Sequence, residues 1–315
     1  MDKLIVSTSP HIRTKISTQN IMADVLIALA PAAIAGGIFF GLRAVLVMAV
    51  CVASAVLAEF LFNIICKKEQ TVKDLSAAVT GLILALCLPA KVEIWQCVVG
   101  SVFAIIVVKC LFGGIGCNFA NPAATARVFM LVAFASAVGG GSETLFNSTD
   151  LVANATPLEL IKADKVNELP SLVDMLLGNR AGAIGETCAI ALIVGGIYLI
   201  VRKVIKWQIP VIYIGTVFLL SLAITQSLTV ALYEVLGGGL IIAAFFMITD
   251  YVSTPINLYG KMAFAFVCAL LTVLIRFWGS YPEGVSFAIL ITNILSPYLE
   301  KLCAPKPLGK GGKTK

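Results

Sequence analysis

The chain has 315 residues, of which 59% are hydrophobic and 13% are charged, and its formal net charge is +6. Soluble domains carry about 25% charged residues, so this chain has too little polar surface to cover its apolar side chains in water. The composition excludes a soluble enzyme, a disordered chain and a disulfide scaffold. It predicts an all-α integral membrane protein.

Ten apolar segments follow one another along the chain, which predicts about ten transmembrane helices. They are 25–41, 44–65, 75–89, 94–112, 122–138, 183–201, 209–226, 230–248, 262–278 and 284–299. The third segment is short and is bounded by Asp74 and Pro89. These limits favour a half-helix or a re-entrant element at that point.

The basic residues indicate how the chain is oriented. With the N-terminus in the cytoplasm, sixteen Lys and Arg residues fall on the cytoplasmic side and six on the outer side. The positive-inside rule therefore places both termini in the cytoplasm. The positive charge is accounted for by topology and membrane lipid, and no nucleic-acid partner is predicted.

An internal similarity predicts two repeats of five helices each. The sequence GLILA at 81–85 recurs as GLIIA at 239–243, an offset of 158 residues. Because five is an odd number of crossings, the two repeats would run through the bilayer in opposite senses, as in many transporters. Chance similarity of a short apolar stretch is the alternative. The predicted organisation is a cytoplasmic segment 1–22, a first repeat 23–138, an extracytoplasmic loop 139–182, a second repeat 183–300 and a basic cytoplasmic tail 301–315.

The loop 139–182 contains Thr156, for which three interpretations are open. Thr156 with Pro157 and Glu159 forms the pattern of a capping box at a helix start. Asn154-Ala-Thr156 and Asn147-Ser-Thr149 are glycosylation sequons. Alternatively, the Thr156 hydroxyl attaches a phosphate-containing cofactor at the helix N-terminus, where backbone N–H groups favour an anion. The first and third interpretations are compatible.

Four motifs, in order along nearly the whole chain, resemble those of one family. They are the stretch from Asp150 to Thr156, Gly116-Cys-Asn118-Phe-Ala-Asn121-Pro122 with Arg127, Gly182-Ala-Ile-Gly185-Glu186-Thr187, and Tyr281-Pro282-Glu283-Gly284-Val285. They resemble the RnfD subunits of Rnf ferredoxin:NAD⁺ oxidoreductases and are similar to the NqrB subunits of sodium-pumping NADH:quinone reductases. The lack of long extensions favours RnfD. Ala153 and Ala120 depart from the usual serine and aromatic residue.

This resemblance implies a flavin-carrying electron-transfer subunit. It implies FMN joined to Thr156 by a phosphoester, added by a separate flavin transferase on the outer face, and non-covalent riboflavin near Asn118, Asn121 and Arg127. It also implies flavin contacts at Glu186 and Thr187. The partners would be the other Rnf subunits in a bacterial plasma (inner) membrane, and electron flow would drive Na⁺ or H⁺ translocation. Whether the chain is an enzyme by itself is left open, and no catalytic or metal residue is predicted.

Several of these residues also have ordinary structural interpretations. Asn118 and Asn121 precede a helix that they would cap. Arg127 is close enough to the end of an apolar segment to extend its charge to the interface. Glu186 would occupy a favourable first-turn position of the sixth segment. Asp24 is predicted to cap the first crossing.

Asp250 is the candidate for an ion pathway. A carboxylate next to an apolar segment is costly and is usually functional. Ser253 and Thr254 follow it closely, and carboxylate, hydroxyl and carbonyl oxygens suit a hard cation. An aspartate in an interfacial loop is the alternative interpretation. Glu59 and Glu234 are weaker candidates. For the whole chain, an inverted-repeat solute channel or secondary transporter is the alternative function.

Overall fold

The computed structural model describes residues 17–139, 156–163, 165, 168–281 and 283–304. Within these ranges every regular element is helical. Four helices are long and apolar enough to cross a membrane: α1 (Thr18–Phe40), α2 (Leu42–Ile65), α10 (Gln208–Thr225) and α13 (Leu258–Trp278). A fifth span arises if α11 (Leu228–Leu236) is joined to Leu240–Met247 across a bend of 61°. The chain is therefore a helical multi-pass membrane protein.

The other elements are shorter. They are η1 (Val72–Asp74), α3 (Ser76–Leu86), α4 (Ile94–Val102), η2 (Phe103–Cys110), α5 (Pro122–Ala133), α6 (Ala135–Val138), α7 (Pro157–Lys162), α8 (Leu172–Leu177), α9 (Ala189–Val201), α12 (Leu240–Ile242), η4 (Ala243–Met247) and α14 (Val285–Leu302). Each of the ten predicted apolar segments overlaps at least one observed helix. The third segment contains the 11-residue α3, which at 1.5 Å per residue is shorter than the hydrocarbon core.

Helix starts follow the capping residues, with one correction to the prediction. Ser17 caps α1, because its side chain accepts a hydrogen bond from the backbone N–H of Asn20. Asp24 was expected to cap this helix, and that prediction was wrong. The helix starts earlier, and Asp24 accepts hydrogen bonds from Tyr198 and Arg202 instead.

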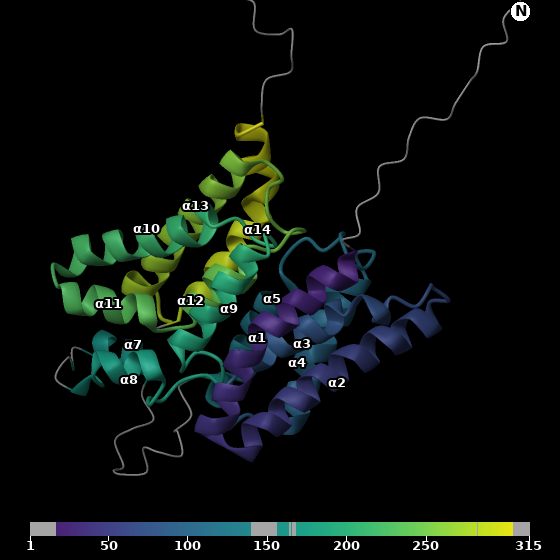
Figure 1. The fold of residues 1–315 in the computed structure, drawn as a ribbon, viewed down its shortest axis with the longest axis horizontal. Helices are drawn as coiled ribbons and strands as arrows, with labels where there is room; N and C mark the ends of the chain where they lie inside the picture. The colour runs from purple at the N-terminus through teal and green to yellow at the C-terminus, as the bar shows by residue number, and fades with distance from the viewer. Residues whose placement is uncertain (1–16, 140–155, 164, 166–167, 282, 305–315) are drawn as a thin grey trace, which may run out of the picture.

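The helices form two groups that follow the chain order. Figure 1 shows α1 to α5 in one group and α10 to α14 in the other, with α1 and α9 side by side. In the first group α2 packs on α3 and α4, and in the second α10 packs on α11 and α13. The groups meet where α1 packs on α9 and where α5 packs on α14.

A non-helical strand of backbone joins the two groups near the end of α3. The sixth apolar segment was expected to be helical from residue 183, but α9 begins only at Ala189. Before it, the N–H groups of Ile184 and Gly185 donate to the carbonyl oxygens of Leu88 and Leu86, at 3.0 and 2.7 Å. A Cβ atom at Gly185 would lie 2.5 Å from Leu86 Cβ, so only glycine permits this approach. The backbone bonds leave these residues outside the helix.

Candidate functional site

The predicted site residues separate into two groups in space. Asn118, Asn121 and Asp250 line one pocket. The other four, Thr156, Glu186, Thr187 and Arg127, do not line this pocket. Arg127 was expected to lie beside Asn118 and Asn121. The structure instead turns it toward Glu283, away from the pocket.

The first pocket lies between the two helix groups and encloses about 790 Å³, part of it open to solvent. Most of its lining is apolar and comes from α1, α3, η4 and the turns that follow η2 and α9. Its polar lining consists of Ser76, Thr80, Lys109, Asn118, Asn121, Thr249 and Asp250. Large apolar walls with a few convergent polar groups are typical of a site for an organic ligand.

The two asparagines of this pocket have different roles. Asn121 caps α5, because its Oδ1 accepts from the N–H groups of Ala123 and Ala124, both at 3.1 Å. The capping prediction is therefore confirmed for Asn121. Its Nδ2 also donates to the carbonyl of Met247 at 3.3 Å, which links the two helix groups. Asn118 has a buried Oδ1 without a hydrogen-bond partner among the described residues, so this atom is free to accept from a ligand.

Asp250 lies in the turn after η4, beyond the helical segment. Its carboxylate accepts from the Ser253 hydroxyl at 3.0 Å and the Val252 N–H at 3.4 Å, and its carbonyl accepts from Thr254 at 2.5 Å. Burial raises the pKa of the Asp250 carboxyl, and these hydrogen bonds partly offset the rise. The predicted proximity of Asp250 to two hydroxyl groups is therefore present.

Sequence reasoning missed a buried ion pair beside this pocket. Lys109 Nζ lies 2.8 Å from Glu59 Oε1 and 2.7 Å from Ser76 Oγ, and both charged residues are almost fully buried. Thr71 donates to the same carboxylate oxygen at 2.6 Å. The sequence signal was available: a lysine and a glutamate each stand inside an apolar segment, where an unpaired charge is costly.

Thr156 begins α7 and is itself buried. Its Oγ1 accepts from the Glu159 N–H at 3.4 Å, and its own N–H donates to Glu159 Oε2 at 2.7 Å. This arrangement confirms the predicted capping box. The rest of the proposed attachment motif, from Asp150 to Ala155, and both sequon asparagines lie outside the described residues.

A second pocket of about 440 Å³ lies beside α7. It is lined by Leu131, Ala135, Val138, Gly139, Glu159, Tyr281 and Glu283. Tyr281 stacks on Phe287 with ring centroids 4.8 Å apart. Because Glu159 is the capping partner of Thr156, the pocket adjoins the residue for which a flavin attachment was predicted.

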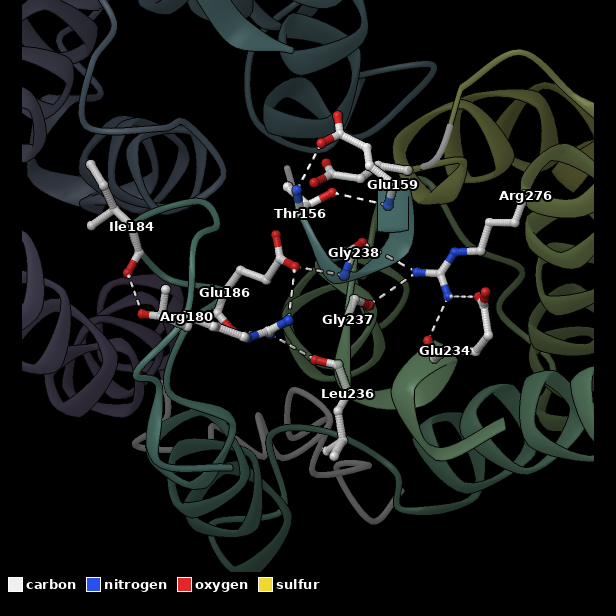
Figure 2. A network of polar contacts seen from close by, with 12 residues as sticks. Thr156, Glu159, Arg180, Ile184, Glu186, Glu234, Leu236, Gly237, Gly238 and Arg276 are labelled. Atoms are coloured by element: carbon white, nitrogen blue, oxygen red, sulfur yellow. Dashed lines mark hydrogen bonds and ion pairs between the residues drawn. The ribbon is translucent and has the colours of Figure 1, made fainter. Parts of the chain in front are cut away.

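The chain is broken between α11 and α12, and buried charges hold the break (Figure 2). Arg276 donates to the carbonyls of Glu234 and Gly237 at 2.5 and 3.0 Å and pairs with the Glu234 carboxylate at 2.9 Å. Arg180 donates to the Leu236 carbonyl at 2.9 Å. Cations thus satisfy the last carbonyls of α11, as expected at a helix C-terminus in an apolar medium.

Glu186 lies on the opposite side of the break. Its Oε1 accepts the Gly238 N–H at 2.6 Å and lies 3.7 Å from Arg180 Nη1. Glu186 was interpreted as a first-turn residue of the sixth segment, but it precedes α9 and bonds to the break before α12. Thr187 donates to the Ile184 carbonyl at 3.4 Å and is fully buried.

Arg127 is buried and forms an ion pair with Glu283. The interpretation in which its charge extends to the interface is therefore wrong. Arg180, Arg276 and Glu283 were not singled out as site residues from the sequence. The two arginines had been counted only as outer-side charges, because sequence spacing does not show which carboxylates they approach.

These features define a class: a polytopic helical membrane protein with buried polar sites and a charge-stabilised helix break. The chain belongs to the NQR2, RnfD, RnfE family, whose model matches residues 5–309. This agrees with the resemblance read from the four sequence motifs.

Individual relatives cover nearly the whole chain, and each is a subunit of a redox complex. The chain is 44% identical to a subunit of the Na(+)-translocating ferredoxin:NAD(+) oxidoreductase complex of Acetobacterium woodii, over 97% of this chain and 95% of the relative. It is 38% identical to its counterpart in the proton-translocating ferredoxin:NAD(+) oxidoreductase complex of Clostridium ljungdahlii, over 96% of each. It is 31% identical to the counterpart in the ion-translocating oxidoreductase complex of an Escherichia coli strain, over 96% of this chain and 98% of the relative.

Proposed function

We propose that this chain is the flavin-carrying electron-transfer subunit of a ferredoxin:NAD⁺ oxidoreductase complex that couples electron flow to Na⁺ or H⁺ translocation. The observation that carries the proposal is the match over nearly the full length to one and the same subunit of such complexes in three organisms. The other subunits of the complex are then its partners in a bacterial plasma membrane.

Thr156 suits the covalent attachment of FMN. It has a hydroxyl, and a pocket of about 440 Å³ with the aromatic side chain of Tyr281 adjoins its capping partner Glu159. The proposed attachment is a phosphoester at Thr156 Oγ1. When bound, a flavin supplies a carrier that accepts and passes on electrons, so the chain itself needs no nucleophile or general base.

The first pocket suits a non-covalent riboflavin. Asn118 Oδ1 is buried and free to accept a hydrogen bond, as the N–H group of a flavin ring would require. The apolar walls match the ring face, and the volume of about 790 Å³ is typical of a cofactor site. In this proposal Asn118 and Asn121 hold the ring, whereas Arg127, Glu186 and Thr187 belong to the region of Thr156.

The helix pairing supports the proposed inverted repeat. The first helices of the two groups, α1 and α9, pack on each other, and so do the last helices, α5 and α14. A two-fold axis between two repeats brings equivalent elements together in this way. Turns predicted on the same side also meet: Arg43 donates to the Ala90 carbonyl at 2.8 Å, and Tyr251 donates to the Val204 carbonyl.

The experiment for the covalent flavin uses the purified chain, produced together with a flavin transferase. In denaturing gels we expect a fluorescent wild-type band, a fluorescent Thr156→Ser band and a dark Thr156→Val band. Mass spectrometry of the peptide that contains Thr156 should show an added FMN. A dark wild-type band, or an adduct on another residue, would refute the attachment at Thr156.

A solute channel or secondary transporter remains the second candidate, because the 61° break between α11 and Leu240–Met247 resembles the discontinuous helices of transporters. That function predicts solute flux into liposomes that contain this chain alone, and no absorbance in the flavin range. Flavin absorbance without flux would reject it.

A further inference from the structure

Helix α7 is held in place by one leucine in a notch at the helix break. Leu158 is 3% exposed. A Cβ atom on Gly238 would lie 2.4 Å from Leu158 Cδ1, and one on Gly237 would lie 3.3 Å from Leu158 Cγ. Two successive glycines therefore leave the space that the leucine side chain fills. We call this space, formed by Gly237 and Gly238, the glycine notch.

The backbone of the glycine notch is held by buried charges (Figure 2). Arg276 donates to the Gly237 carbonyl at 3.0 Å, and the carboxylate of Glu186 accepts the Gly238 N–H at 2.6 Å. Gly238 has φ of +65°, a conformation that favours glycine. The notch is thus a fixed seat, and α7 is the element that can leave it.

A second contact holds the other end of α7. Lys162 donates to the carbonyl of Gly279, which ends α13, at 2.5 Å. Lys162 is exposed, so this bond competes with water and is weaker than the contact in the notch. Leu158 is therefore the main anchor of the six-residue helix.

While α7 is seated, Thr156 is inaccessible. The residue is 2% exposed, and its Oγ1 accepts the Glu159 N–H. An enzyme that transfers FMN must bring a flavin diphosphate ester to this oxygen. The hydroxyl oxygen would form the new P–O bond, the bond from the flavin phosphorus to the leaving phosphate would break, and the hydroxyl proton would pass to the leaving group. None of this is possible at a buried hydroxyl.

We propose that α7 must leave the glycine notch before the flavin transferase can modify Thr156, and that Leu158 then reseats the helix and positions the attached group. This inference rests on the proposed attachment at Thr156. It assigns a role to Leu158, Gly237 and Gly238 as positioning residues, which act on the modified residue through α7. Local opening of a short peripheral helix requires no unfolding of the core.

The first test locks α7 in its seat in the full-length chain in membranes. Leu158→Cys and Gly237→Cys are combined, because the two side chains are adjacent and Gly237 has φ of −98°, which any residue adopts. The double variant is oxidised, and the new bond is verified by mass spectrometry before transferase and FAD are added. We expect at least tenfold slower flavin attachment than after reduction. Equal rates would overturn the proposal, and both single variants with the same oxidant serve as controls.

The second test loosens the seat. Leu158→Ala should accelerate flavin attachment several-fold, whereas Leu160→Ala, which changes a half-buried leucine on the same helix, should leave the rate unchanged. Equal rates in the two variants would contradict the role of Leu158.

A third measurement needs no flavin. In a Thr156→Cys chain, maleimide should label the new thiol several-fold faster when Leu158→Ala is added than when Leu160→Ala is added. If labelling is the same in both while wild-type chain accepts flavin, the seating proposal fails and the attachment proposal stands. If labelling differs but wild-type chain never accepts flavin, the attachment proposal fails instead.

Discussion

Single buried charges in this protein are matched by a specific partner or by backbone carbonyls. Lys109 pairs with Glu59, Arg127 with Glu283, and Arg276 with Glu234. In a bilayer an unmatched charge is costly, so these pairs stabilise the structure mainly by removing that cost. The roles of Arg180 and Glu186 differ, because both also bond to backbone at the helix break.

At the residue scale, replacement of Glu186 separates its two roles. Glu186→Gln keeps an oxygen that accepts the Gly238 N–H but removes the charge opposite Arg180. Glu186→Ala removes both, and loss of one partner of a buried pair costs about 3–5 kcal/mol. We expect thermal unfolding in detergent to show a clearly lower Tm for Glu186→Ala and a smaller decrease for Glu186→Gln. An unchanged Tm for Glu186→Ala would show that the break does not depend on this carboxylate.

At the scale of elements, the start of α5 combines a local and a long-range interaction in one side chain. Asn121 caps its own helix and also donates to the Met247 carbonyl at the end of η4. The capping function follows from the local sequence Asn-Pro, because Pro favours the first helical position. The bond to Met247 depends on how the two helix groups pack.

Two substitutions of Asn121 distinguish these interactions. Asn121→Asp keeps the capping oxygen and loses the donor to Met247, whereas Asn121→Ala loses both. Loss of an N-cap costs about 1 kcal/mol. We therefore expect the lowest Tm for Asn121→Ala and an intermediate value for Asn121→Asp. If Asn121→Asp is as unstable as Asn121→Ala, the contact between the helix groups outweighs the cap.

At the scale of the whole molecule, the two sites lie in different regions. Asn118, Asn121 and Asp250 line the pocket between the helix groups, and Thr156 lies at α7 beside the second pocket. In the proposed topology the first region is cytoplasmic and the second is on the outer side. This separation suits a subunit that passes electrons across the membrane.

Transport by the assembled complex tests Asp250. Asp250→Asn should reduce coupled ion transport in proteoliposomes at least several-fold and leave flavin content unchanged. Because burial raises the pKa of this carboxyl, transport that needs the ionised form should fall with acidification at a higher pH than an exposed aspartate would give. Unchanged coupled transport in Asp250→Asn, with the same pH profile, would exclude Asp250 from the ion pathway.

The sequence by itself determined the features that depend on neighbouring residues. Composition and apolar runs determined the helical membrane class, and local capping patterns predicted the starts of α5 and α7, because these interactions join residues three or four positions apart. The four motifs indicated the family. Asp24 was misassigned because Ser17 offered an earlier cap.

Only the tertiary structure decided which distant residues meet. It placed Arg127 on Glu283, Lys109 on Glu59 and Leu158 in the glycine notch, contacts that span between 50 and 156 positions for the two ion pairs. It also showed that segment eight is broken at 237–239. Neither spacing nor hydropathy encodes such contacts, because they arise when separate helices pack and each buried polar group must find a partner.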